Sequence, residues 1–288
     1  MSTLNPRELV RRASRWMFDV QTAATSAWSV EWCLRLFGAL IAIRCATWRF
    51  HAHAKMPAEL TEPVWFLMPF SPVPVWVMVT AQVVGVVGGV AVAARWKMVP
   101  SFRIALGAFV VLGGIRTGVG KILHNDVMFI VTALPFAWSS AKTSIRETNG
   151  WQLRAAQMTA AVVYFLTGIQ KVRHSGPSWI FSDNMRWIME SASRRDGALW
   201  PAFGHTIASH TVLWFISGAA LIGMELVFPL ALKQGWWRRC LVVGAIGLHA
   251  MAFLGIGLDY GNWVAADLIL FVNWPWLRER IVGAPPLS

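Results

Sequence analysis

Charged residues and cysteines are scarce in this chain of 288 residues. Only 14% of the residues are charged, whereas a disordered chain needs high charge and a coiled coil needs heptads rich in charged residues. The three cysteines, Cys33, Cys45 and Cys240, form neither a CxxC pair nor a zinc spacing. They are also too few for a disulfide-stapled secreted domain. These shortages exclude three classes of protein.

What the chain has in abundance is apolar sequence. Hydrophobic residues make up 56% of it and the mean hydropathy is +0.50, which is too apolar for a soluble globule of this length. The net charge of +12 is compatible with nucleic-acid binding, but in a membrane protein Lys and Arg serve first to set the topology. We therefore expect a bilayer as the partner and no nucleic acid.

Apolar segments alternate with short polar connections along most of the chain. This pattern predicts an all-α, polytopic bundle of about eight transmembrane helices. Several of the segments are shorter than the roughly 20 residues of a perpendicular span, so we expect 127–140 and 260–276 to extend into their flanks or to tilt. The eight segments lie near residues 29–48, 74–94, 101–119, 127–140, 155–171, 209–232, 240–257 and 260–276.

The polar ends of the chain complete the predicted organisation. Residues 1–28 have the pattern of an amphipathic helix lying on the membrane, with Asn5 as N-cap and Pro6 in the first turn. The alternative is a frayed basic tail. The predicted transmembrane domain covers 29–277 and a cytoplasmic tail covers 278–288. Residues 183–195 alternate in polarity like a short interfacial helix.

The distribution of Lys and Arg predicts the orientation. When eight spans alternate, most of these residues fall in short connections on the side that also holds the N-terminus. The positive-inside rule then places both termini in the cytoplasm of a multi-pass plasma-membrane protein. Pairs of glycines four residues apart, Gly85 with Gly89 and Gly114 with Gly118, predict close helix packing.

Ionisable residues inside the apolar segments are candidates for a functional site, because hydrocarbon penalises unpaired charge. Arg35 and Arg44 require acidic partners, for which Glu225 and Asp267 are available, and a structural ion pair is the plainest interpretation. The other members of this group are Lys121, Lys171 and His249. His51 and His53 are spaced to share a metal, but no further ligand pattern joins them, so we predict no metal site.

Lys171 ends the fifth apolar segment. Tyr164, Gly168 and Lys171 are spaced to form one column on a helix, with a gap at the glycine. A half-buried amine at the membrane border is partly desolvated and can act as a base. The alternative is a lysine that snorkels to the lipid headgroups.

The sequence from Tyr164 to Lys171, followed by Trp179, resembles the signature of the membrane domain of vitamin K-dependent gamma-carboxylases and their bacterial relatives, the HTTM (horizontally transferred transmembrane domain) proteins. The resemblance extends over about residues 29–276. Weaker similarities are Leu123-His124-Asn125, Glu225 with Pro229, and Leu248-His249.

The resemblance implies a quinol-dependent, oxygenase- or carboxylase-like activity in a cavity at the outer membrane face. It implies that Lys171 is the base that deprotonates a reduced naphthoquinone, while His124 assists an oxyanion or carboxylate. Tyr164 belongs to the same implied catalytic group. The implied cofactor site consists of Trp179, His249 and Glu225.

Two departures separate this sequence from the carboxylases. The stretch between Lys171 and Trp179 is longer than expected, and the 288 residues include no large soluble region that would present a peptide. We therefore expect no peptide carboxylation. The first hypothesis is a small quinol-dependent or peptide-modifying membrane enzyme. The alternative is a non-catalytic membrane partner or assembly subunit, in peptide maturation or in a larger membrane complex.

Overall fold

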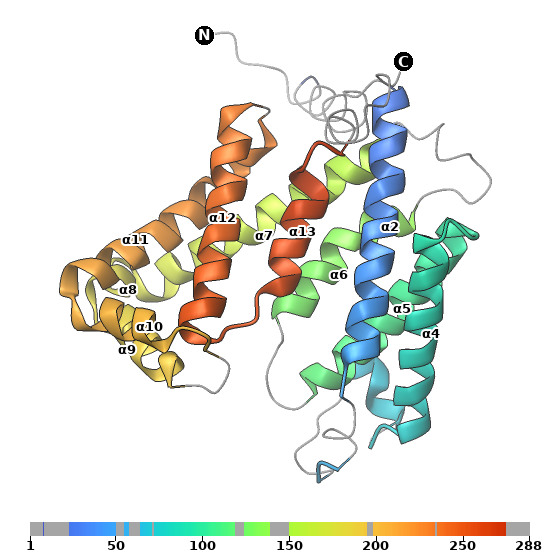
Figure 1. Cartoon of the computed structure of the whole chain (residues 1–288), viewed down its shortest axis with the longest axis horizontal. Coiled ribbons are helices and arrows are strands. Elements are labelled where there is room, and N and C mark those ends of the chain that lie inside the picture. The colour runs from blue at the N-terminus through green and yellow to red at the C-terminus, as the bar shows by residue number, and fades with distance from the viewer. Residues whose placement is uncertain are drawn as a thin grey trace. The chain divides into compact units, whose positions relative to one another are not determined.

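The computed structural model describes residue 8 and the ranges 23–49, 55–57, 64–70, 72–118, 124–138, 150–194, 198–233 and 235–274. All regular elements in these ranges are helices (Figure 1). The chain divides into two compact units: residues 1–156 with 272–288, and residues 157–271. The long helix α7 (Trp151–Ser175) contributes its first turns to the first unit and the remainder to the second.

Three long helices, α2, α4 and α5, pack side by side in the first unit, and α6 packs on α5 (Figure 1). Phenylalanine rings fill the space between them: Phe37 on α2 meets Phe129 on α6 at a centroid distance of 5.2 Å. Phe129 also meets Phe109 on α5 at 5.2 Å. The elements of this unit are α2 (Ala23–Thr47), η2 (Trp65–Phe70), α4 (Val75–Ala93), α5 (Met98–Thr117) and α6 (His124–Ala137).

Glycines bring α2 and α4 together as the spacing predicts. A Cβ added at Gly89 would lie 2.4 Å from the carbonyl oxygen of Gly38 on α2, and one at Gly85 would lie 2.5 Å from Cys45 Sγ. The prediction for Gly85 and Gly89 is therefore confirmed. Gly114 is also crowded, but by side chains of the segment around η2.

The second unit surrounds α7 with shorter and longer helices. Glycines in the left-handed region mark the ends of its main elements: Gly176 (φ 56°) follows α7, and Gly257 (φ 64°) caps α12. The elements are α7 (Trp151–Ser175), α8 (Ser178–Phe181), α9 (Asn184–Ser193), α10 (Pro201–Ser209), α11 (Thr211–Val227), η4 (Phe228–Leu232), α12 (Trp236–Ile256) and α13 (Gly261–Phe271).

Each of the eight predicted segments corresponds to a helix, and the predicted short helix at 183–195 corresponds to α9. Within the described residues, four helices are long and apolar enough to cross a membrane: α4, α5, α11 with η4, and α12. This finding indicates a multi-pass membrane protein. The predicted N-terminal helix and C-terminal tail lie largely outside the described residues, although α2 begins at Ala23, within the range predicted for the former.

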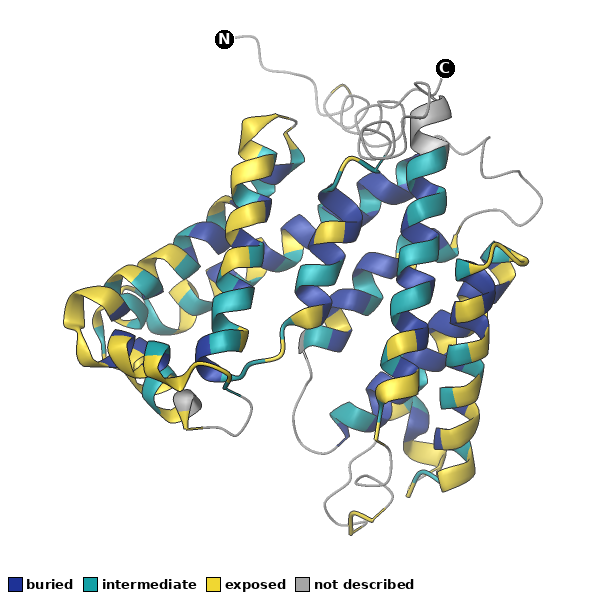
Figure 2. Ribbon diagram, in the orientation of Figure 1, coloured by how far each residue is buried: buried dark blue, intermediate teal, exposed yellow. Residues whose placement is uncertain are grey.

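One side of α4 is exposed along the helix, as Figure 2 shows. Apart from Thr80, the exposed residues are apolar: Val75, Trp76, Val79, Val83, Val87 and Val90. A face of this kind is costly in water and favourable in lipid.

Arg35 and the two acids of the apolar segments have partners that the sequence did not suggest. Arg35 donates through Nε to the carbonyl oxygen of Ala93 at 3.1 Å, and its guanidinium lies 4.5 Å from the ring centroid of Trp32. The acids Glu225 and Asp267 bond to other residues of the second unit. The suggested pairing of arginines with these two acids is therefore not the arrangement observed for Arg35.

Candidate functional site

The candidate site is built on one face of α7. Tyr164 and Gly168 are buried and Lys171 is half-buried, whereas Phe165, Leu166 and Ile169 between them are exposed. This alternation is the one expected of a helix that turns a single column toward its unit's interior. The spacing of 164, 168 and 171 therefore places two polar side chains and a gap on the inward face.

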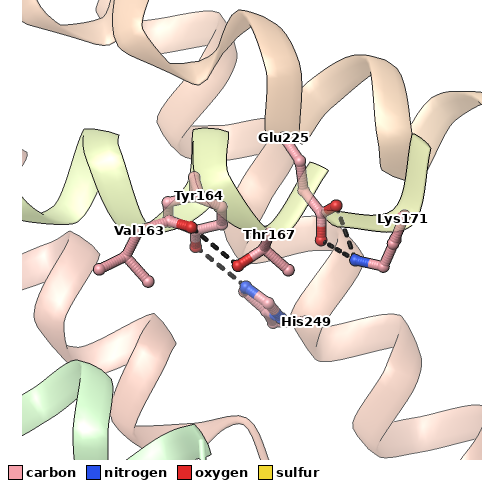
Figure 3. A network of polar contacts seen from close by, with 6 residues as sticks. All are labelled: Val163, Tyr164, Thr167, Lys171, Glu225 and His249. Carbon is pink, nitrogen blue, oxygen red and sulfur yellow. Dashed lines mark hydrogen bonds and ion pairs between the residues drawn. The ribbon is translucent and has the colours of Figure 1, made fainter. Parts of the chain in front are cut away.

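Lys171 is held by a carboxylate from α11. Its Nζ donates to Glu225 Oε1 at 2.5 Å and to Oε2 at 2.6 Å, as Figure 3 shows. The side chains are 22% and 8% exposed respectively, so the acid is almost completely covered. The ammonium also lies 5.6 Å from the ring centroid of Trp179. Lys171 is thus partly sheltered by protein groups, with Glu225 and Trp179 as its neighbours.

The gap at Gly168 makes this ion pair possible. A Cβ at this position would lie 3.1 Å from Glu225 Cβ and 3.1 Å from Leu226 Cδ2. The absence of a side chain therefore allows α11 to approach α7 closely enough for the carboxylate to reach the ammonium one turn further along.

A second polar cluster surrounds the hydroxyl of Tyr164. This hydroxyl donates to Asp267 Oδ2 on α13 at 2.7 Å and lies 2.9 Å from His249 Nε2 on α12. A hydroxyl has a single proton, so when it donates to Asp267, the bond to His249 requires an Nε2–H donor. In this state, His249 therefore carries a hydrogen on Nε2. All three residues are buried.

Aromatic rings enclose the Tyr164 cluster. The tyrosine ring lies 4.0 Å from that of Phe228 and 4.9 Å from that of Trp263, measured between centroids. The His249 ring lies 4.8 Å from that of Tyr260. In such surroundings, hydrogen bonds are stronger and an unpaired polar group is more costly than in water.

Two buried polar atoms in this cluster have no hydrogen-bond partner among the described residues. They are Asp267 Oδ1 and Trp263 Nε1, both on α13. Buried polar groups of native proteins are nearly always paired, so each such atom requires an explanation.

Five of the six site residues predicted from the sequence lie in the second unit. Tyr164 contacts His249, and Lys171 contacts Glu225 and Trp179. The sixth, His124, is the first residue of α6 in the first unit, and its side chain lies outside what the structure describes. His51 and His53 likewise lie outside the described residues.

Asp267 and Trp263 belong to the cluster, but the sequence did not assign either to the site. Asp267 was one of the ionisable candidates in the apolar segments, with an arginine as its suggested partner. Their spacing of four residues within an apolar segment is the signal that could have identified them, because it places a donor and an acceptor on one helical face.

The two clusters are joined by α7. Tyr164 and Lys171 are seven residues apart, which is about 10 Å along a helix. Together they provide an ammonium, two carboxyl groups, an imidazole and a phenol, the set that general acid–base chemistry uses. In the described part of the chain, no three His, Cys, Asp or Glu residues are grouped to bind a metal ion.

No protein-family model matches this chain, and no curated protein or solved structure matches it significantly. Arguments about its function therefore depend on the residues themselves.

Proposed function

We propose that this protein is a multi-pass membrane enzyme that deprotonates a reduced naphthoquinone, with Lys171 as the base and Glu225 as its proton acceptor. The observation that carries the proposal is the bidentate contact between these two side chains at 2.5 and 2.6 Å, next to Trp179. The resemblance of residues 164–171 and 179 to the gamma-carboxylase membrane domain supports the same assignment.

An ammonium that is paired with a carboxylate cannot accept a proton. Lys171 becomes a base only when one of its protons moves to Glu225, which converts the ion pair into an amine and a carboxylic acid. The short separation makes this transfer direct, and the covered position of Glu225 limits competition from water. The amine can then take the proton of a quinol hydroxyl, while the ring of Trp179 offers an apolar surface to a planar aromatic substrate.

Tyr164, His249 and Asp267 form the second part of the proposed site. Their hydrogen bonds provide a path along which a proton can move without a charge entering the apolar surroundings alone. The role of His124 stays a prediction from the resemblance.

We further propose eight spans in the plasma membrane with both termini in the cytoplasm. The excess of Lys and Arg on the side of the N-terminus supports this topology. It places the C-terminal end of α7, and therefore Lys171, at the outer face, where a lipid-soluble quinol can enter from the bilayer.

The test compares Lys171→Met with Arg173→Met in purified protein reconstituted into lipid vesicles. Arg173 is an exposed cation on the same helix and serves as the matched control. Oxygen uptake is measured with 1,4-dihydroxynaphthalene and corrected for protein-free vesicles. We expect Lys171→Met to lower the protein-dependent rate by at least about 100-fold, the usual contribution of a general base. Arg173→Met keeps the wild-type rate.

Two results would contradict this function. One is a wild-type protein without quinol-dependent oxygen uptake. The other is equal activity of the two variants, which would make the Lys171–Glu225 pair a structural connection between α7 and α11 and favour a non-catalytic assembly subunit.

A further inference from the structure

The two unpartnered atoms on α13 have complementary chemistry. Trp263 Nε1 carries a hydrogen to donate, and Asp267 Oδ1 has lone pairs to accept one. The residues are only 6% and 0% exposed, so bulk water does not satisfy these atoms at the molecular surface. A donor and an acceptor left unpaired in one apolar region are each unfavourable, unless a guest group satisfies both.

Both residues face the same neighbour. They are four positions apart on α13 and therefore share a helical face. Tyr164 contacts both: its ring lies 4.9 Å from that of Trp263, and its hydroxyl donates to Asp267 Oδ2 at 2.7 Å. The two unpaired atoms thus belong to neighbouring side chains of one helical face, both of which contact Tyr164.

The chemistry of Trp263 Nε1 and Asp267 Oδ1 restricts which chemical group can satisfy both atoms. An anion would be repelled by Asp267, and an ammonium group would leave the Trp263 N–H without an acceptor. An indole N–H does not bind metal ions. A hydroxyl accepts one hydrogen bond and donates another through a single oxygen atom, which is what this pair requires.

We propose that Trp263 and Asp267 form a binding subsite for a hydroxyl group. Trp263 Nε1–H donates to the hydroxyl oxygen, and the hydroxyl donates its own hydrogen to Asp267 Oδ1. The hydroxyl belongs either to a water molecule or to a bound ligand. The second case rests on the proposed function, because a quinol supplies such a group.

This subsite extends the network around Tyr164. The guest hydroxyl bonds to one oxygen of Asp267 and Tyr164 bonds to the other, so the carboxylate connects the guest to His249 through the tyrosine. Asp267 is then a positioning residue that orients both hydroxyl groups.

The test replaces Trp263 with β-(3-benzothienyl)alanine, which keeps the shape of the side chain and removes only the N–H donor. The same replacement at Trp76, an exposed residue of α4, is the matched control. A second variant, Asp267→Asn, presents a donor in the place of an acceptor. Melting temperature is measured in lipid nanodiscs. Under argon, binding is measured for 1,4-dihydroxynaphthalene and for 1,4-dimethoxynaphthalene, which has no hydroxyl hydrogen.

The two sources of the hydroxyl predict different results. If it belongs to water, the replacement at Trp263 and Asp267→Asn both lower the melting temperature of the unliganded protein. If it belongs to the ligand, both variants weaken binding of 1,4-dihydroxynaphthalene by about tenfold, the effect of losing one good hydrogen bond. Asp267→Asn leaves binding of 1,4-dimethoxynaphthalene unaffected, because this compound has no hydrogen to donate to Asp267. The replacement at Trp76 changes neither quantity.

The subsite is refuted if the replacement at Trp263 leaves the melting temperature unchanged or raised and leaves binding of 1,4-dihydroxynaphthalene unchanged. Failure of the wild-type protein to bind this quinol would count against the proposed function alone, because the melting temperatures still decide whether water occupies the subsite.

Discussion

The hydroxyl of Tyr164 joins three helices of the second unit. It bonds to Asp267 on α13 and to His249 on α12 from its own position on α7. Tyr164→Phe keeps the ring that packs on Phe228 but leaves one oxygen of a fully buried carboxyl without its donor. We expect a loss of about 1–3 kcal/mol in the free energy of unfolding, the usual cost of an unsatisfied buried group. Thermal unfolding in detergent measures it.

A second variant separates this cause from a packing defect. In Tyr164→Phe combined with Asp267→Leu, the unsatisfied carboxyl is gone together with its donor, so part of the lost stability should return. The effect of Asp267→Leu is therefore measured twice, in the wild-type protein and in Tyr164→Phe. If Asp267→Leu lowers the free energy of unfolding equally in both, the hydrogen bond is not the cause of the loss.

The same reasoning predicts the cost of removing one charge from the Lys171–Glu225 ion pair. Lys171→Met leaves the covered carboxylate of Glu225 without its cation, and we expect a loss of about 3 kcal/mol. Lys171→Met with Glu225→Gln removes both charges and should be more stable than Lys171→Met alone. A double-mutant cycle of unfolding free energies measures the coupling. Additive effects of the two substitutions would show that the contact contributes nothing to stability.

At the residue scale, the sequence predicted which residues form the site more accurately than which of them bond to each other. Ionisable residues in apolar segments are few, so Lys171, Glu225 and His249 could be identified from burial cost alone. Which acid meets which cation depends on how α7 and α11 pack at Gly168, and this contact has no local signature. Asp267 was identified as an intramembrane acid, but its tyrosine partner was not, because a phenol does not need a charged partner.

At the scale of elements, glycine positions determine how closely helices approach. Gly89→Ala would place a Cβ 2.4 Å from the backbone oxygen of Gly38, which cannot move away without shifting α2. We expect a loss of about 1–3 kcal/mol, as for other overpacked cores. Gly107→Ala on α5 is the control, because nothing lies within 4 Å of the added atom. Thermal unfolding of both variants measures the difference.

In Gly107→Ala, the better helix propensity of alanine should leave stability unchanged or raise it by up to about 1 kcal/mol. Equal destabilisation of both variants would show that the loss in Gly89→Ala reflects glycine replacement in general. The contact between α2 and α4 would then not be its cause.

Helices were the part of the fold that hydropathy could predict, because a long apolar run has few other stable forms. Their ends were less accurate: α7 begins at Trp151, four residues before the predicted start, and continues to Ser175. Gly150 and Gly176, both with positive φ, determine these ends. A hydropathy average does not detect single residues that adopt the left-handed conformation.

At the scale of the whole molecule, length and composition distinguish four candidate spans from two shorter apolar helices among the described residues. The helices α4, α5, α11 with η4, and α12 satisfy the requirements of a membrane span. The helices α6 and α13 are shorter apolar helices. Hydropathy predicted all of these segments, but whether the short ones cross the bilayer depends on their neighbours, which the sequence does not specify.

The proposed orientation predicts which exposed residues can be reached from outside the cell. With both termini in the cytoplasm, Lys233 after η4 faces the cytoplasm and Ser178 on α8 faces the outside, and both residues are exposed. In a background with Cys240→Ser, which removes the exposed native thiol, Lys233→Cys and Ser178→Cys each introduce one accessible thiol. Cys33 and Cys45 are buried and should react little.

A membrane-impermeant maleimide should label Ser178→Cys in intact cells, and Lys233→Cys only after the membrane is opened. The reverse pattern would place Lys171 on the cytoplasmic side and would contradict a quinol site at the outer face. Labelling of both positions in intact cells would contradict any topology in which α11 with η4 crosses the membrane once.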